Sequence, residues 1–336
     1  MQYVNLGSST MKVSKVALGT MTFGKMNTEK EAFAIMDRAR ELGITYFDTA
    51  NNYGGGVGLR GRVEQMMNRW FREGDKRRES VILASKFGLE VEEEADGVND
   101  AMGLSAYKMR RSLERSLKRL GTDRLELYTM HHEDRQANWD EIWGAYENLI
   151  AQGKIYYAGS SNFSAWELCR AKFEAEKRHF LGMVVEQHKY NLFCRLPELE
   201  MFPASRALGV GISAYNPLCG GYLTENALNP RPGTRAAGDN IYSKTMGVYN
   251  EGPYREQLVR FDKLCKEAGL LQSDVAMAWV CHNPYVNVVI IGPRTVEQLE
   301  RSVRAAELKL DDDFLRTLDE IFPGPGGEAP KAYMRF

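Results

Sequence analysis

Cysteine is scarce in this chain of 336 residues, and the few present follow no metal-binding pattern. They are odd in number, and no two stand in a Cys-x-x-Cys spacing. Scattered thiols of this kind do not form the framework of a disulfide-stabilised domain, and they lack the paired spacing of a zinc cluster. We expect no bound metal and five reduced thiols, at Cys169, Cys194, Cys219, Cys265 and Cys281.

The chain also has little net charge and no long apolar run. Its formal net charge of -1 at pH 7 creates no overall field that would attract nucleic acid or an anionic membrane. No window approaches the roughly 18 apolar residues of a spanning helix, and the first residues form no charged leader followed by an apolar stretch. We therefore expect a cytoplasmic protein with a small-molecule partner and no nucleic-acid or membrane partner. The sequence does not specify its oligomeric state.

No linker rich in Pro, Gly or Ser interrupts the middle of the chain. Short runs of β-branched and aromatic residues alternate with longer segments of helical periodicity, which is typical of a parallel sheet covered by helices. About eight such cycles predict an α/β fold of the (β/α)8 type, a TIM barrel, as a single domain over residues 1–336. The expected strands cover residues 16–19, 45–48, 81–85, 125–128, 155–159, 184–187, 210–214 and 288–291.

Helical periodicity and capping signals lie between these strands. We expect amphipathic helices over residues 29–42, 106–120, 139–151 and 165–178. Three helix starts match the capping-box pattern, in which a Ser or Thr side chain and a Glu or Gln three residues later bond each other's backbone. These are Thr28 with Glu31, Ser164 with Glu167, and Thr295 with Gln298.

Three segments fall outside the alternation. Residues 3–13 alternate around Gly7-Ser8-Ser9, which predicts a β-hairpin that plugs the N-terminal end of the barrel. Residues 217–253 are rich in Gly, Asn and Pro and directly follow a strand, so we expect a long binding loop on the C-terminal face. Residues 323–330 are rich in Pro and Gly and predict an irregular surface segment.

Titratable side chains recur at the carboxyl ends of successive strands, which meet at one mouth of a parallel barrel. Asp48, Tyr53, Lys86 and His131 are the prominent ones. Such a set suits a reaction that delivers a proton to a developing alkoxide. Lys86 would favour the phenolate of Tyr53, Asp48 would keep Lys86 charged, and His131 would align the carbonyl oxygen. Because no residue here is a hydride source, carbonyl reduction would require a nicotinamide.

Other chemistries have weaker support. Residues 56–61 match the GxGxxG spacing of a dinucleotide fold, but the first Gly does not directly follow a strand and no acidic residue ends the next one. His131 and His132 are adjacent rather than spaced as helix ligands, which disfavours a metal site. Residues 159–162 lack the last glycine of a G-x-S-x-G elbow, which disfavours a serine hydrolase.

Five motifs in order resemble the aldo-keto reductase superfamily. They are Gly19-Thr20-Met21, Phe47-Asp48-Thr49-Ala50, Tyr53-Gly54, Ser85-Lys86 and Leu127-Tyr128-Thr129-Met130-His131. The resemblance continues through Gly159-Ser160-Ser161-Asn162-Phe163. The resemblance covers nearly the whole chain. It implies Asp48, Tyr53, Lys86 and His131 as the catalytic tetrad, the same four residues that the strand ends suggest.

The resemblance also implies an NADPH (NADP+) cofactor and the residues that hold it. Ser161, Asn162 and Gln187 would bind the nicotinamide carboxamide, and Tyr215 would stack on its ring. The backbone of Asn216, Pro217, Leu218, Gly220 and Gly221 would pass under the pyrophosphate. Further expected contacts are Thr20, Met21, Asp48, Ile291, Gly292, Gln298 and Ser302.

The chain departs from the family pattern where the adenosine would bind. Arg301-Ser302 replaces a usual Glu-Asn, and Glu225-Asn226 stands where a lysine is common. We therefore assign the 2′-phosphate to Arg294 together with Arg235, because guanidinium groups suit a phosphate, and we expect NADPH in preference to NADH.

Two other functions remain open. The β-subunits of voltage-gated potassium channels resemble this family and bind cofactor while serving a partner, so a regulatory subunit is one alternative. A barrel isomerase or lyase is the other. The sequence does not name the aldehyde or ketone; the polar residues 132–135 after His131 suggest a polar carbonyl compound.

Overall fold

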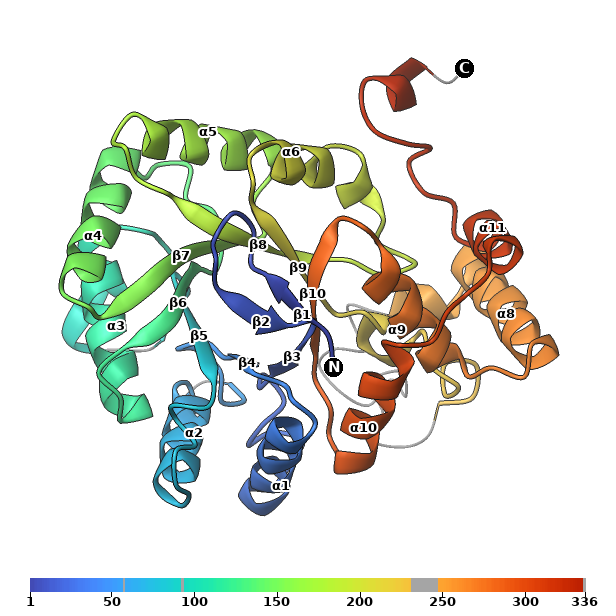
Figure 1. Cartoon of the computed structure of the whole chain (residues 1–336), viewed down its shortest axis with the longest axis horizontal. Coiled ribbons are helices and arrows are strands. Elements are labelled where there is room, and N and C mark those ends of the chain that lie inside the picture. Colours follow the sequence, from blue (N-terminus) through green and yellow to red (C-terminus); the bar gives the residue numbers. More distant parts are fainter. Residues whose placement is uncertain (57, 92–93, 231–246, 335–336) are drawn as a thin grey trace.

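The structure is a computed structural model that describes residues 1–56, 58–91, 94–230 and 247–334. Eight parallel strands close into a barrel in the order β10-β3-β4-β5-β6-β7-β8-β9, with helices around it (Figure 1). This confirms the predicted (β/α)8 barrel, and each strand lies within two residues of its predicted bounds. The strands are β3 (Val16–Gly19), β4 (Tyr46–Asp48), β5 (Ile82–Phe87), β6 (Leu125–Met130), β7 (Ile155–Ser161), β8 (Met183–Lys189), β9 (Gly211–Tyr215) and β10 (Val286–Ile291).

The four helices named from periodicity are present and keep their first residues. They are α1 (Glu29–Glu41), α3 (Ala106–Leu120), α4 (Trp139–Ala151) and α5 (Ala165–Glu176). The other α-helices in the described ranges are α2 (Arg62–Arg72), α6 (Met201–Ala207), α8 (Gly252–Glu267), α9 (Gln272–His282), α10 (Val296–Ala305) and α11 (Asp312–Ile321). No helix within the described ranges has both the length and the apolar character needed to cross a membrane.

Two of the three predicted capping boxes form and the third forms only in part. Both reciprocal bonds are present at Thr28 and at Ser164. At α10, the Thr295 side chain accepts from the backbone N–H of Gln298, but the side-chain oxygen Oε1 of Gln298 accepts from the backbone N–H of Arg294, one residue before the cap. The prediction of a full box at Thr295 was therefore wrong, because Gln298 bonds the loop that enters the helix.

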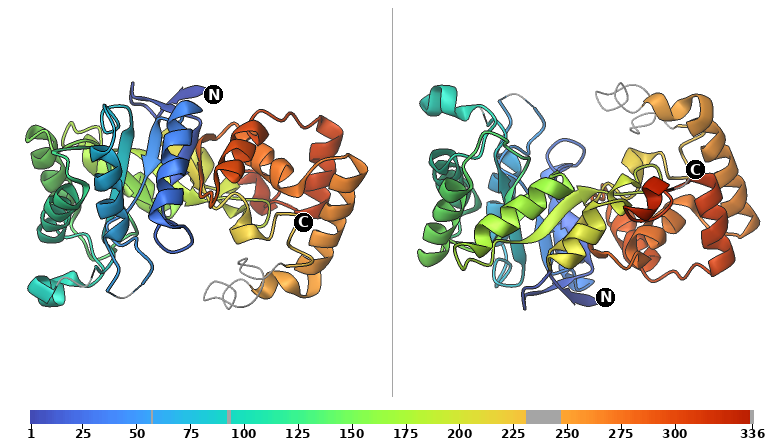
Figure 2. Two further views of the ribbon diagram at one scale, coloured as in Figure 1. Left: turned by 90° about the horizontal axis from the view of Figure 1, so that it is seen from below. Right: turned by 90° about the horizontal axis from the view of Figure 1, so that it is seen from above.

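The predicted hairpin is confirmed and seals one end of the barrel. Strands β1 (Tyr3–Asn5) and β2 (Lys12–Ser14) pair antiparallel, and Leu6 between them is fully buried with residues of the barrel interior. Gly7 has φ 58°, and a Cβ there would lie 2.1 Å from the Val184 carbonyl oxygen, so the turn fits only a glycine. Figure 2 shows the hairpin at one end of the barrel and the β5–α3 loop near residues 94–103 at the other.

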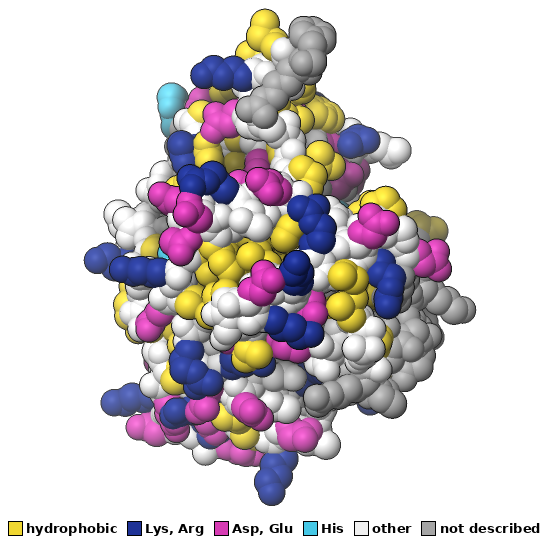
Figure 3. Space-filling view, turned by 90° about the vertical axis from the view of Figure 1, so that its right-hand side faces the viewer, with side chains coloured by type: hydrophobic (Ala, Val, Ile, Leu, Met, Phe, Trp, Pro, Cys, Tyr) yellow, Lys and Arg dark blue, Asp and Glu magenta, His cyan; other side chains and the backbone are white. Residues whose placement is uncertain are grey.

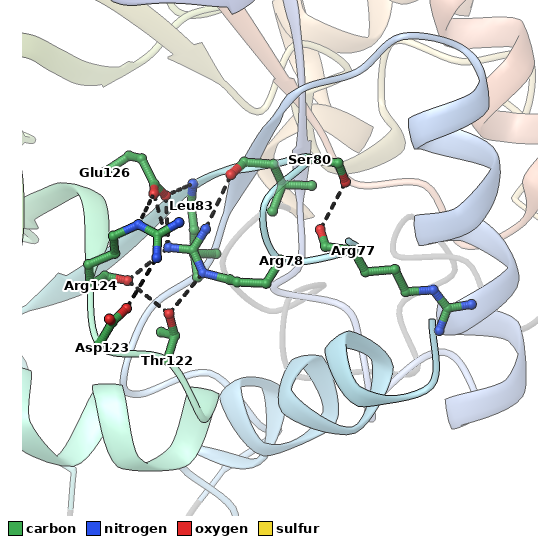
Figure 4. Close-up of polar contacts among 9 residues, drawn as sticks. Arg77, Arg78, Ser80, Leu83, Thr122, Asp123, Arg124 and Glu126 are labelled. Atoms are coloured by element: carbon green, nitrogen blue, oxygen red, sulfur yellow. Dashed lines mark hydrogen bonds and ion pairs between the residues drawn. The ribbon is translucent and has the colours of Figure 1, made fainter. Parts of the chain in front are cut away.

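A buried arginine ties the amino ends of neighbouring strands together. The Arg78 guanidinium donates to Thr122 Oγ1, to the Arg124 carbonyl and to Glu126, at distances of 2.8–3.1 Å (Figure 4). Glu126 also accepts from the backbone N–H of Leu83 on β5. This polar network belongs to the amino ends of β5 and β6, so conservative changes there should affect stability more than chemistry.

The segments predicted to be irregular contain no long helix where the structure describes them. Residues 217–230 hold only the short 3₁₀ helix η3 (Cys219–Gly221), and α8 begins at Gly252. Residues 323–330 form bends and turns before η6 (Lys331–Met334). On the face over the C-terminal helices, positive and negative side chains are interspersed (Figure 3), in keeping with the small net charge.

Candidate active site

Adjacent strands bring the four predicted catalytic residues together. Asp48 is the last residue of β4, Lys86 lies near the end of β5, and His131 directly follows β6. These three strands are neighbours in the barrel. Tyr53 comes from the β4–α2 loop, and its ring meets the His131 ring edge to face with centroids 6.0 Å apart.

Lys86 stands between an anion and a phenol. Its side chain is fully buried, and its Nζ lies 2.6 Å from Asp48 Oδ2 and 3.4 Å from the Tyr53 hydroxyl. The Thr49 carbonyl accepts a further bond of 2.9 Å. Burial opposes the ammonium charge, but Asp48 and Tyr53 outweigh it and raise the pKa of Lys86 above its usual value. A permanent positive charge therefore faces the Tyr53 oxygen.

His131 is held as a neutral imidazole. Burial, the Lys86 charge and His132 together hold the pKa of His131 well below its usual value. Its Nδ1 is buried and has no hydrogen-bond partner among the described residues. At neutral pH the ring can thus donate one hydrogen bond, but it carries no extra proton to transfer.

The four residues assigned to the nicotinamide lie side by side at the carboxyl ends of β7, β8 and β9, and Asn162 directly follows β7. Gln187 Nε2 donates to Asp48 Oδ1 at 2.9 Å, which links this group to the tetrad. The Asn162 amide donates to Ser161 Oγ at 2.9 Å, and its oxygen accepts from the Tyr215 hydroxyl at 2.7 Å. Asn162 also donates to the His131 carbonyl at 3.0 Å. The predicted carboxamide-binding residues therefore form one connected group next to the catalytic residues.

The backbone after β9, where we expect the pyrophosphate to bind, makes a tight turn. Asn216 and Gly220 both have positive φ, and Asn216 Oδ1 accepts from the Gly220 N–H at 2.7 Å, which fixes the turn. A Cβ added at Gly221 or at Gly292 would meet no atom of the described residues within 4 Å. Open space beside two glycine backbones suits a ligand that approaches the main chain closely. The neighbouring Pro217 is buried and Leu218 is half-buried.

The remaining expected contacts are divided between buried and accessible positions. Thr20 is fully buried, and its hydroxyl donates to the Asp48 carbonyl at 3.0 Å, so it supports β4. Met21 next to it is 40% exposed. Ile291 is the buried last residue of β10. Thr20 therefore supports β4, whereas the side chain of Met21 on the same loop is accessible.

The residues expected at the adenosine end lie in the β10–α10 loop and in the first two turns of α10: they are Arg294, Gln298 and Ser302. The Ser302 hydroxyl donates to the Gln298 carbonyl at 2.9 Å, one helical turn back. The Arg294 carbonyl accepts from Asn27 Nδ2 at 2.5 Å, which fixes the β10–α10 loop. Arg235, the second expected phosphate ligand, lies outside the described residues.

The two departures from the family pattern contact each other. Arg301 donates to Glu225 at 2.5 Å and to Asp274 at 2.7 Å. Arg301 on α10 thereby fastens the segment after η3, which carries Glu225, and α9, which carries Asp274. Its guanidinium Nε and Nη2 thus pair with two carboxylates of this protein.

The polar run after His131 is largely structural. Asp134 accepts from the backbone N–H of Leu104 at 3.0 Å, and Arg135 pairs with Glu167 of α5 at 2.8 Å. These two charges position the loop, so they give little support to the prediction of a polar substrate.

Sequence reasoning missed a buried acid, Glu186, beside Gln187. Its side chain has no exposed surface, and it faces the helices because Gln187 next to it faces the barrel interior. Burial raises the pKa of Glu186 to about 8, against the hydrogen bonds it accepts from Ser160 and from the backbone of Phe163 and Asn162. A glutamate inside the apolar β8 pattern was the available signal, since Glu is rarely buried without partners.

The raised pKa makes stability depend on pH. In the unfolded chain Glu186 ionises near pH 4.3, whereas in the folded protein it stays protonated until about pH 8. The contribution of Glu186 to stability is therefore fully present below its unfolded pKa and is lost as pH rises to its folded pKa. We expect the free energy of unfolding of the wild type to fall by roughly 4 kcal/mol relative to Glu186→Gln between pH 4.5 and 8. Urea titrations of both proteins across this range measure the difference, and parallel curves would contradict it.

With this geometry in place, the chain can be compared with known proteins. The model described as "Aldo/keto reductase family" matches residues 15–322. An "Uncharacterized oxidoreductase YrpG" of Bacillus subtilis is 50% identical over 99% of both chains. "Protein tas" of Escherichia coli is 30% identical over 97% of this chain and all of its own length. A rice protein named "Probable voltage-gated potassium channel subunit beta" is 30% identical over 92% of each chain. These matches confirm the resemblance read from the motifs: the chain belongs to the aldo/keto reductase family and is an oxidoreductase.

Proposed function

We propose that this protein reduces the carbonyl group of an aldehyde or ketone with NADPH, and that Tyr53 donates the proton. The observation that carries the proposal is the buried Lys86 ammonium, which lies 2.6 Å from Asp48 and 3.4 Å from the Tyr53 hydroxyl. This charge stabilises the negative charge that develops on the Tyr53 oxygen as its proton leaves. Asp48 keeps Lys86 in place and charged.

The residues fit a nicotinamide cofactor. The joined side chains of Ser161, Asn162 and Gln187 offer amide and hydroxyl groups to a carboxamide. Tyr215 at the end of β9 offers a ring for stacking, and the open backbone at Gly221 leaves room for phosphates. When bound there, the cofactor supplies the hydride.

His131 has a separate role from Tyr53. Because burial and Lys86 keep its imidazole neutral, His131 donates a hydrogen bond to the carbonyl oxygen and orients it. The proton that completes the alcohol then comes from Tyr53, whose oxygen faces Lys86. In this proposal His131 orients the carbonyl group, and Tyr53 transfers the proton.

The direct test is the loss of NADPH absorbance with a panel of aldehydes and ketones, with product analysis. We expect stoichiometric conversion of at least one carbonyl compound to its alcohol. A protein that binds NADPH but reduces no member of the panel, even in single turnovers, would favour the regulatory alternative. An isomerase or lyase would convert its substrate without consuming NADPH.

Cofactor choice gives a second test. We expect Arg294→Ala to weaken NADPH binding by about 10- to 100-fold and to leave NADH binding nearly unchanged, since a charge-assisted contact to phosphate is worth about 1.5–3 kcal/mol. Arg304→Ala is the matched control, because it changes an exposed arginine in the last turn of α10, the helix that follows the Arg294 loop. Fluorescence titrations measure both dissociation constants. Equal weakening of both cofactors would disprove the assignment of Arg294.

A further inference from the structure

The carboxyl group of Glu186 is bound to one short turn. Ser160 Oγ donates to its Oε2 at 2.5 Å, and the backbone N–H of Phe163 donates to its Oε1 at 3.1 Å. The backbone of Asn162 also contributes a hydrogen bond. Ser160 precedes this turn on β7, while Asn162 and Phe163 form it, so one carboxyl group holds both sides of the exit from β7.

This turn connects both parts of the candidate site. Asn162 has φ 63°, a left-handed conformation that costs a non-glycine residue free energy unless the surroundings hold it. Its side chain donates to the His131 carbonyl and accepts from the Tyr215 hydroxyl. The orientation of Asn162 therefore depends on a strained backbone that Glu186 supports from the helix-facing side of the barrel wall.

We propose that Glu186 is a positioning residue for the cofactor: its carboxyl group fixes the turn of residues 161–163, so that Ser161 and Asn162 present their side chains to the nicotinamide carboxamide. Glu186 does not touch the ligand, because it lies on the opposite side of β8 from Gln187. The inference rests on the proposed NADPH-dependent function.

The protonated form of Glu186 suits this role. Burial raises its pKa to about 8, so at neutral pH one oxygen can accept from the backbone while the other shares a proton with Ser160. Glu167 of α5 adds to the repulsion that keeps Glu186 neutral, and Tyr215 of β9 is the other titratable group that interacts with it. Glutamine has the same shape and the same arrangement of acceptor and donor, whereas leucine has neither.

The test uses two ligands that differ only in the nicotinamide. NADPH and 2′-phospho-ADP-ribose share the adenosine phosphates, but only NADPH carries the carboxamide. We expect Glu186→Leu to raise the Kd for NADPH about tenfold, the effect of losing one or two hydrogen bonds, and to leave the Kd for 2′-phospho-ADP-ribose within about twofold. Glu186→Gln should bind both ligands like the wild type. Calorimetric titration measures all six constants, two for each of the three proteins, without requiring turnover.

A matched control separates positioning from general destabilisation. Glu126→Leu removes a largely buried carboxylate at the amino end of β6, at the other end of the barrel (Figure 4). It should lower the melting temperature and leave both Kd values unchanged.

The outcomes distinguish the inference from the function on which it rests. If Glu186→Leu weakens both ligands equally or neither, the positioning role is overturned and the proposed function stands. If Glu186→Leu does not fold, Ser160→Ala takes its place, because it removes the hydroxyl that donates to the Glu186 carboxyl group. Selective weakening of NADPH in that variant supports the positioning role, and equal or unchanged binding of both ligands overturns it. If the wild-type protein binds neither ligand, the NADPH-dependent function and the inference fail together.

Discussion

Tyr53→Phe is expected to lower kcat by roughly 10²–10⁴ and to leave the Kd for NADPH within about twofold of the wild type. The substitution removes only the hydroxyl, which lies 3.4 Å from Lys86 Nζ, and keeps the ring that packs against His131. The substitution should therefore lower turnover without changing cofactor binding. The measurements are kcat with one good aldehyde and the cofactor Kd by fluorescence, at matched pH.

Tyr156→Phe is a suitable control for this experiment. Tyr156 lies near the amino end of β7 and is 47% exposed, so loss of its hydroxyl should not change turnover. If Tyr53→Phe keeps near-native turnover, the proton comes from another group. For His131 to be that group it would have to be protonated, and its buried position beside Lys86 lowers its pKa and opposes this.

The architecture followed from local patterns because the barrel repeats one simple unit. Buried β-branched runs and amphipathic helices are visible in sequence, and parallel strands with short connections bring their carboxyl ends to one mouth. This is why Asp48, Lys86 and His131, which are distant in sequence, could be grouped before their geometry was known. The single-domain assignment and the roles of these residues stay predictions.

Two features could not be predicted from the sequence: the start of an uncapped helix and a contact between residues far apart in the chain. Gly61, the residue before helix α2, has a left-handed backbone conformation, and no side chain caps this helix. The sequence therefore carries no capping signal that would have marked the start of α2. The contact of Arg301 with Glu225 joins residues far apart in the chain. The sequence shows a missing family residue at each position, but it does not show that the two replacements attract each other.

Lys86→Met is expected to lower kcat by about as much as Tyr53→Phe, because it removes the charge that stabilises the Tyr53 phenolate. The two side chains act as one unit, so the double variant should be little slower than either single variant. If their effects instead multiply, Lys86 and Tyr53 contribute independently, and the proposed action of the Lys86 charge on the Tyr53 phenolate is wrong.

Stability must be measured alongside, because Lys86→Met also leaves Asp48 buried without its cation. Asp48 is only 3% exposed and keeps the hydrogen bond from Gln187, so we expect a loss of about 3 kcal/mol in the free energy of unfolding, which is typical of a broken buried ion pair. Combining Lys86→Met with Asp48→Asn in one chain removes both charges and should recover part of this stability without recovering turnover. Recovery of turnover in that variant would show that Lys86 serves the fold alone, and would contradict its role beside Tyr53.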